Sequence, residues 1–112
     1  VGSHASRVAK AILRLRRDFR TEHTLAELAK TAGMSATSFH QHFKAVTGTT
    51  PLQYQKDLRL IAARTLLAVP GQSVAEAAFA LGYESPTHFS RDYKRKFGRP
   101  PGRDARAADA TP

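Results

Sequence analysis

Apolar residues recur along this chain at the three- and four-residue spacing of amphipathic helices. Within residues 5–20 they share one face of a predicted helix, at Val8, Ile12, Leu15 and Phe19. Thr24 and Glu27 then form a capping box, which places the start of a second helix there. The apolar stripe of that second helix runs over Leu25, Leu28, Ala29 and Ala32.

Glycines and hydroxyl side chains set the ends of the helices that follow. Gly33 ends the second helix because glycine tolerates the positive φ of a helix C-terminus. Ser35 can cap a third helix, which ends at Gly48 and turns Phe39, Phe43 and Val46 inward. The helical period continues through the chain, so we predict an all-α fold with no sheet.

The order of caps, apolar residues and glycines in the first half returns in the second half. Pairs before the turn are 49 residues apart and pairs after it are 50 apart, so the second turn is one residue longer. The pairs include Thr24 and Ser73, Glu27 and Glu76, Gly33 and Gly82, Phe39 and Phe89, Phe43 and Tyr93, Gly48 and Gly98, and Pro51 and Pro101. Two helices around a tight turn form a helix-turn-helix, and two copies in register indicate an internal duplication.

A long helix is predicted between the two copies, from Pro51 to about residue 68, before Pro70 and Gly71 break it. One side of it carries Tyr54, Leu58, Ile61, Ala62, Thr65 and Val69, and the opposite side carries Leu60, Ala63 and Leu67. A helix that is apolar on two sides must bury both, so we expect it to pack against both copies. Its length of about 27 Å compares with about 34 Å between successive major-groove faces on one side of B-DNA.

This organisation divides the chain into five expected segments. They are a remnant of an expression tag over 1–4, a first helix-turn-helix subdomain over 5–49, a linker helix over 50–69, a second helix-turn-helix subdomain over 70–103 and a loosely ordered tail over 104–112. The tag interpretation rests on the Gly-Ser-His start without an initiator Met, and it suggests a fragment of a longer protein. The tail offers little apolar surface to bury.

Charge and composition narrow the function of these helices. The 112 residues carry a formal net charge of +9 and include no cysteine. Such a basic chain favours a polyanion, either nucleic acid or an acidic membrane surface, although surface charge also serves solubility alone. The absence of cysteine excludes disulfides, thiolate metal sites and cysteine nucleophiles. No apolar run reaches the roughly 18 to 20 residues of a membrane span.

The outward faces of the two second helices carry the candidate reading residues. With Phe39 inward, the first unit presents Thr37, His40, Gln41 and Lys44; with Phe89 inward, the second presents Thr87, Ser90, Arg91 and Lys94. We include Ser38 and Arg95 in the candidate set. Both faces are rich in hydrogen-bond donors and lack acids, which favours nucleic acid over an ordinary solvated surface.

Individual side chains suit particular bases. Gln41 suits bidentate pairing with adenine and Arg91 with guanine, while threonine methyl groups can touch thymine. Lys44 and Lys94 suit phosphates. His40 and His42 point in different directions on a helix and have no carboxylate nearby in sequence, so we expect no metal site. No phosphate-binding glycine loop and no nucleophile–base pair is evident, so we expect neither an enzyme nor a cofactor.

These residues resemble the AraC-type regulator family over about residues 5–103. The second unit carries its signature at Ala78, Gly82, Tyr83, Ser85, Phe89, Arg91, Lys94, Phe97, Gly98 and Pro101. The first unit is similar, from Gly33-Met34-Ser35 through Phe39–Lys44 and Gly48 to Pro51–Tyr54. The chain departs at Gly102-Arg103-Asp104, where the family has a short helix ending in Tyr-Arg, so the last helix is expected to be short or absent.

The resemblance implies a bacterial, cytoplasmic regulator that works at the nucleoid. It implies a domain of about seven helices that binds double-stranded DNA through two recognition helices and commonly activates transcription by contacting RNA polymerase. Its DNA contacts would fall on Thr37, His40 and Gln41, and on Thr87, Ser90 and Arg91. Family members usually carry a separate effector or dimerisation domain, which these residues do not supply.

Three other functions remain open at this point. The main alternative is a module whose basic faces dock an acidic protein without DNA. A repair enzyme would need a reactive centre, and methyl transfer to a thiolate is impossible in a chain without cysteine. A helix lying on a membrane surface is disfavoured by the repeated compact units, so we expect no membrane partner.

Overall fold

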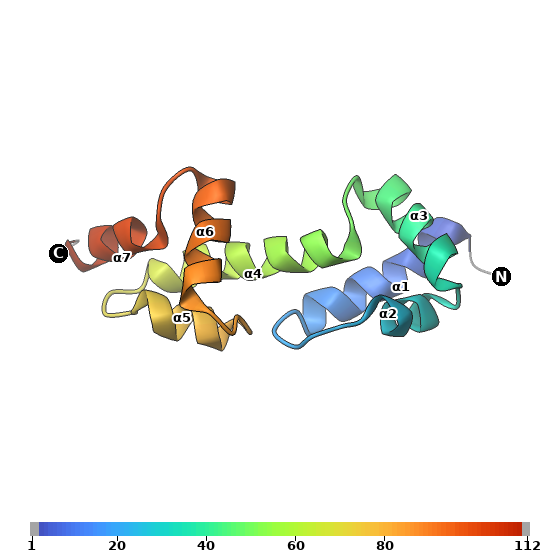
Figure 1. Cartoon of the computed structure of the whole chain (residues 1–112), viewed down its shortest axis with the longest axis horizontal. Helices are drawn as coiled ribbons and strands as arrows, with labels where there is room; N and C mark the ends of the chain where they lie inside the picture. The colour runs from blue at the N-terminus through green and yellow to red at the C-terminus, as the bar shows by residue number, and fades with distance from the viewer. Residues whose placement is uncertain (1–2, 111–112) are drawn as a thin grey trace. The chain divides into compact units, whose positions relative to one another are not determined.

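The computed structural model describes residues 3–110, and over that range the chain forms seven helices and no strand (Figure 1). The predicted all-α class with about seven helices is thereby confirmed. The helices are α1 (His4–Arg17), α2 (Leu25–Ala32), α3 (Ala36–Thr47), α4 (Pro51–Leu67), α5 (Val74–Ala80), α6 (Pro86–Phe97) and α7 (Pro101–Ala110). Val1 and Gly2, half of the expected tag remnant, lie outside the described residues.

Two compact units meet inside α4. The first unit runs to Asp57 and the second begins at Leu58. Figure 1 shows α4 as one uninterrupted helix, so its first turns belong to one unit and its later turns to the other. The long helix is therefore shared between the units and is not a separate segment.

Local sequence signals start and end the short helices where they were expected. Thr24 Oγ1 accepts a hydrogen bond from the Glu27 amide at 3.1 Å, and the Glu27 carboxylate accepts one from the Thr24 amide at 3.4 Å. Ser35 caps α3 by accepting from the Ser38 amide at 3.2 Å. Gly48 takes a φ of 78° after α3, which a residue with a side chain rarely adopts. These caps satisfy backbone groups that the helix itself leaves unpaired.

The second unit repeats this arrangement with one difference. Ser73 caps α5 and Ser85 caps α6, each through its hydroxyl oxygen. α5 ends at Ala80, and Leu81 is its C-cap, so Gly82 follows one residue after the cap. In the first unit the corresponding glycine, Gly33, is itself the C-cap. The extra residue of the second turn lies after Gly82, because Gly33 and Gly82 are still 49 residues apart whereas Ser35 and Ser85 are 50 apart.

The first unit's core is built on the aromatic side chains of α3. Phe39 and Phe43 are fully buried with ring centroids 5.5 Å apart, and Phe43 meets the Tyr54 ring edge-on at 5.6 Å. Apolar residues of α1 and α2 complete it, namely Val8, Ala11, Leu15, Leu28, Ala29 and Ala32. The prediction that Val46 faces inward is wrong, since its side chain is 48% exposed.

The second unit's core repeats the aromatic pair and extends it. Phe89 and Tyr93 are fully buried, with centroids 5.8 Å apart, and Tyr83 packs edge-on against Phe89 at 5.2 Å. The surrounding apolar residues are Leu60, Ala63, Leu67, Ala77, Ala78 and Leu81. The stripe of α5 therefore plays the part that the stripe of α2 plays in the first unit.

The expected burial of two opposite sides along α4 is wrong for its later turns. Leu60, Ala63 and Leu67 are buried, but Ile61 is 49% exposed and Thr65 is exposed. α4 serves the two units with different turns instead. Within the first unit its initial turns bury Pro51 and bring Tyr54 against Phe43.

A buried amide fixes the start of α4 in the first unit. Gln55 donates from Nε2 to the carbonyl oxygens of Phe19 at 3.0 Å and Thr21 at 2.5 Å. Its side chain is almost completely buried. Gln55 thus satisfies the backbone of the loop after α1, which a leucine at this position could not do.

The expected loose tail is also wrong over residues 104–110, which belong to α7. Asp104 accepts hydrogen bonds from the Tyr93 hydroxyl and, at 2.5 Å, from Arg99 Nε. Asp109 Oδ1 accepts from the Gly71 amide at 2.7 Å. Pro101 is buried, so the helix is held by polar contacts and one apolar anchor. The spacing of apolar residues in the sequence does not reveal such polar contacts.

The Asp104 cluster changes the acidities of its members. The hydrogen bond from Arg99 holds the pKa of Asp104 below its usual value. Burial, aided by the hydrogen bond to Asp104, raises the pKa of Tyr93 well above its ordinary value. At neutral pH the cluster therefore contains an ionised Asp104 beside a neutral tyrosine.

We predict that Asp104→Asn destabilises the second unit by about 1 to 3 kcal/mol at neutral pH, because hydrogen bonds to a charged acceptor are lost. The folded-state pKa of Asp104 is depressed, so its contribution is complete above the unfolded-state pKa near about 3.9 and disappears as the pH falls through the folded-state value. Urea unfolding at pH 7 and near pH 2 measures both effects. Glu84→Gln, an exposed acid of the same unit, is the control and should change little.

An equal loss of stability for Asp104→Asn at both pH values would show that charge is not what Asp104 contributes.

Candidate nucleic-acid interface

α3 presents a polar face opposite its buried aromatic side. Thr37, Gln41 and Lys44 are exposed and His40 is half-buried, whereas Phe39 and Phe43 are fully buried. The two sides follow from the helical period: residues one and two positions from Phe39 cannot share its direction. No acid occurs in α3, so nothing on this face repels an anion.

Ser38 lies apart from the other candidate residues of α3. It is half-buried, and its Oγ lies 3.3 Å from His42 Nδ1, which also lies 2.8 Å from the Ser38 carbonyl oxygen. The His42 ring in turn contacts the His4 ring, with centroids 3.8 Å apart and the ring planes tilted by 46°. Ser38 is therefore engaged by His42 of its own helix, and the candidate residues that remain on the outward face are Thr37, His40, Gln41 and Lys44.

α6 presents the corresponding face of the second unit. Thr87, Arg91, Lys94 and Arg95 are exposed and Ser90 is half-buried. Phe89 and Tyr93 occupy the buried side, as Phe39 and Phe43 do in α3. The last turn of α6 adds Lys96 to Lys94 and Arg95, which makes this helix end strongly basic.

Asp92, the acid within α6, is turned away from that face. Its side chain is only 13% exposed, and Oδ2 accepts a hydrogen bond from the Tyr83 hydroxyl at 3.2 Å. Oδ1 lies 3.9 Å from Nη1 of the exposed Arg95. The carboxylate thus helps to hold α6 against the core and orients Arg95 along the helix. Sequence periodicity excluded Asp92 from the outward face but did not reveal its partners.

Arg59 of α4 is a supporting residue that sequence reasoning missed. Its guanidinium lies 5.8 Å from the centroid of the Tyr83 ring, and Nη1 donates to the Gly82 carbonyl oxygen at 3.4 Å. These contacts hold the turn between α5 and α6. Nothing in the apolar pattern distinguishes this arginine from a solvated one.

The basic residues of α1 fall into two groups. Arg14 Nη1 donates to Thr31 Oγ1 at 2.6 Å, and Arg16 Nε donates to the Tyr54 hydroxyl at 3.2 Å. These two arginines tie α1 to α2 and to the first turns of α4. Lys10 and Arg17 are exposed, so they are available to a polyanion at the surface.

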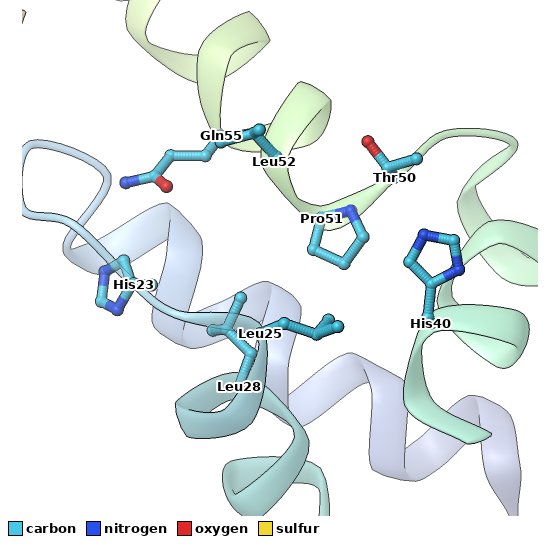
Figure 2. A pocket seen from close by; sticks show the side chains of 8 residues that line it. All are labelled: His23, Leu25, Leu28, His40, Thr50, Pro51, Leu52 and Gln55. Atoms are coloured by element: carbon cyan, nitrogen blue, oxygen red, sulfur yellow. The ribbon is translucent and has the colours of Figure 1, made fainter. Parts of the chain in front are cut away.

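A cavity of about 300 Å³ lies beside the reading face of the first unit. It is lined by His23, Leu25, Leu28, His40, Thr50, Pro51, Leu52 and Gln55, all shown in Figure 2. His40 is common to the cavity and to the outward face of α3. A shallower hollow on the other side of His40 is lined by Leu25, Ala36, Thr37, His40 and Gln41.

The described residues contain neither a metal cluster nor a membrane-spanning helix. Among residues 3–110, no three histidine, aspartate or glutamate side chains gather as a metal would require. In the same range, every helix is too short or too polar to cross a bilayer.

Comparison with known proteins identifies this arrangement. A family model described as a helix-turn-helix domain matches residues 28–107. The transcriptional activator RhaS of Escherichia fergusonii is 39% identical over 83 residues, which cover 70% of this chain and 30% of RhaS. The chain therefore spans about a third of the length of the curated relatives it matches.

Solved structures share the fold over nearly the whole chain. An AraC-type DNA-binding-domain regulator from Chromobacterium violaceum has a TM-score of 0.83 and 28% identity, covering 95% of this chain and 94% of its own. The DNA-binding domain of AdpA, a global transcriptional factor determined in complex with a target DNA, also has a TM-score of 0.83 and 28% identity. That similarity covers 92% of this chain and 93% of the AdpA chain.

We predict that the hydrogen bond between Tyr83 and Asp92 stabilises the second unit more than the ion pair between Arg95 and Asp92 does. Tyr83→Phe keeps the ring but removes a buried hydrogen bond to Asp92, and should cost about 0.5 to 1.5 kcal/mol. Arg95→Ala removes an exposed ion pair at long distance and should cost about 0.5 kcal/mol or less. Urea unfolding of the two variants measures this. A larger loss for Arg95→Ala would reverse the assignment.

Proposed function

This chain belongs to the AraC-type family of helix-turn-helix transcription regulators, and from that premise we propose that it binds specific double-stranded DNA sequences through α3 and α6. The observation that carries the proposal is the match between the outward faces of these two helices. Each is rich in donors, and each is opposed by two buried aromatic residues one turn apart. The net charge of +9 supplies the attraction to phosphate.

Reading and positioning fall to different side chains. We assign base reading to Gln41 on adenine and Arg91 on guanine, since both can pair with two atoms of one base edge. Thr37 and Thr87 lie a turn earlier on their helices, where their methyl groups can meet thymine. Phosphate contacts go to the residues in the later turns, Lys44, Lys94 and Arg95. His40 and Ser90 complete the two faces.

The two helices are proposed to enter successive segments of the major groove. One uninterrupted helix of 17 residues joins the two units, a length of about 26 Å. Successive groove faces lie about 34 Å apart, a distance of the same order as the length of this helix. The AdpA domain, solved with its target DNA, shows that the same fold accommodates a duplex in that protein.

Regulation belongs to a protein larger than this segment. The relatives are about three times as long as the part matched here, which leaves room for an effector or dimerisation domain in a parent protein. RhaS is named as a transcriptional activator. We propose that the parent of this chain also activates transcription, and that it does so by contacting RNA polymerase. Its place of action would then be the bacterial cytoplasm, at the nucleoid.

We predict that duplex affinity falls steeply with salt, because bound cations release counterions from phosphates. Three or more phosphate contacts give a slope of about −3 or steeper for log affinity against log salt. Fluorescence-anisotropy titration of a labelled duplex at several salt concentrations measures it. A flat response, together with poor competition by duplex for an acidic protein partner, would favour the alternative of a protein-docking module.

We predict that Arg91→Ala costs about 1 to 3 kcal/mol on a preferred site and relaxes the preference at one base pair. Lys94→Ala, three residues along the same helix, should weaken all duplexes alike. Arg17→Ala in α1 is the control for charge alone, since Arg16 is tied to Tyr54. The measurement is a set of titrations on a selected site and on sites altered at single positions.

A uniform loss for Arg91→Ala would make Arg91 a phosphate contact. No loss at all would place base reading in the first unit, and Gln41→Ala should then show the base-selective effect.

A further inference from the structure

The cavity beside α3 has the size and shape of a small-molecule site. Figure 2 shows Leu25 and Leu28 of α2 on one side of it and Pro51 and Leu52 of α4 on the other. A closed apolar cavity of about 150 Å³ admits benzene. The hollow here has a volume of about 300 Å³ and opens to solvent at Leu25 and Leu52, so a molecule of two fused rings fits with one edge exposed.

The lining chemistry selects an uncharged ligand. None of the eight lining residues is an aspartate, glutamate, lysine or arginine. A charged group placed between the leucines and the proline would lose its hydration without gaining a partner, which is costly. A flat aromatic molecule instead gains contact with both apolar walls.

The polar side chains at one end of the cavity are partly engaged by the loop after α1. Gln55 donates to the carbonyl oxygens of Phe19 and Thr21, and His23 Nε2 lies 2.8 Å from the Asp18 carbonyl oxygen. Nδ1 of His23 is buried and has no hydrogen-bond partner among the described residues. Because that nitrogen is closed to solvent, a molecule in the cavity does not reach it.

His40 and Thr50 are the polar side chains at the opposite end, and Thr50 Oγ1 already accepts a hydrogen bond from the Gln53 amide at 3.2 Å. Figure 2 shows the His40 ring standing across from Pro51, away from His23 and Gln55. The His40 side chain is half-buried. A neutral imidazole has one N–H donor and one nitrogen that accepts a hydrogen bond. A ligand with a single N–H or O–H group can donate to that acceptor while its ring lies between the apolar walls.

We propose that this cavity binds a small uncharged aromatic molecule with one hydrogen-bond donor, of the indole or phenol class, through His40. The second part of the inference rests on the proposed function. His40 also lines the hollow with Thr37 and Gln41, so a ligand that holds the His40 ring withdraws it from the DNA-reading face. Occupancy of the cavity therefore weakens duplex binding.

Titration with indole tests the site on the protein without DNA. The chain contains no tryptophan, so indole fluorescence can be followed free of protein emission at its excitation wavelength. We expect saturable binding at one site. 1-Methylindole, which keeps the rings but lacks the N–H donor, should bind severalfold more weakly because it cannot donate a hydrogen bond to the half-buried His40 ring.

Variants locate the site. His40→Phe keeps a ring but removes the acceptor, so indole and 1-methylindole should bind it equally. Leu52→Ala shortens one wall and should weaken both ligands severalfold. Leu13→Ala, a similarly exposed leucine of α1 outside the cavity, should retain the wild-type affinities. Circular dichroism confirms that each variant is folded.

The proposal would be overturned by any of three results. These are non-saturable binding, equal affinity of indole and 1-methylindole for the wild type, and a preference for indole that survives in His40→Phe.

Titration of a selected duplex in saturating indole tests the coupling to DNA. Duplex affinity should fall by the same factor by which duplex lowers indole affinity, since linkage is reciprocal. Unchanged duplex affinity would overturn the coupling. If the protein bound no duplex at all, the proposed function would fail, while the indole titration of the free protein would still decide whether the cavity is a ligand site.

Discussion

The burial of two aromatic rings one helical turn apart is the constraint on which each half of this protein depends. Phe39 and Phe43 in α3, and Phe89 and Tyr93 in α6, are completely buried. Aromatic side chains bury more area than any other residues, so these pairs determine which side of each helix faces the core. The opposite side must then face outward, and its chemistry is free to serve recognition. The orientation of the reading face is thus a consequence of core packing.

The two units stabilise the same arrangement by different means. The first unit uses Gln55 to satisfy the loop after α1, and it leaves a cavity bordered by His40. The second unit has a denser polar network, in which Arg59 supports Tyr83 and Tyr83 binds Asp92. At its far end, Asp104 joins Tyr93 to Arg99. The two units therefore differ in the polar side chains that hold a common apolar framework.

This divergence has a functional meaning for a family of DNA-reading domains. A reading helix with firm support holds its side chains close to one geometry, which favours specific base contacts. α6 is supported through Asp92 and Tyr83, and its outward face carries Arg91. α3 borders a cavity through His40, so its face is open to influence by a second molecule. The two proposals therefore assign different tasks to the two helices, stable reading to α6 and modulation to α3.

The sequence by itself determined the fold class, the duplication and the outward residues of α3 and α6. These features depend on periodicity and on local caps such as Thr24 with Glu27, which involve neighbours three or four positions away. It also carried the family resemblance, which the comparisons confirmed. Helix ends at Gly33 and Gly48 were predictable for the same local reason.

Only the tertiary structure decided which polar residues hold helices and loops together and which are simply solvated. Arg16, Arg59, Gln55 and Asp104 find partners between 5 and 38 positions away, and no local pattern encodes such pairs. For that reason α7 and the one-sided burial of the later turns of α4 could not be foreseen. The cavity at His40 is likewise formed by α2, α3 and α4 together, because side chains from separate helices enclose a space that no single segment defines.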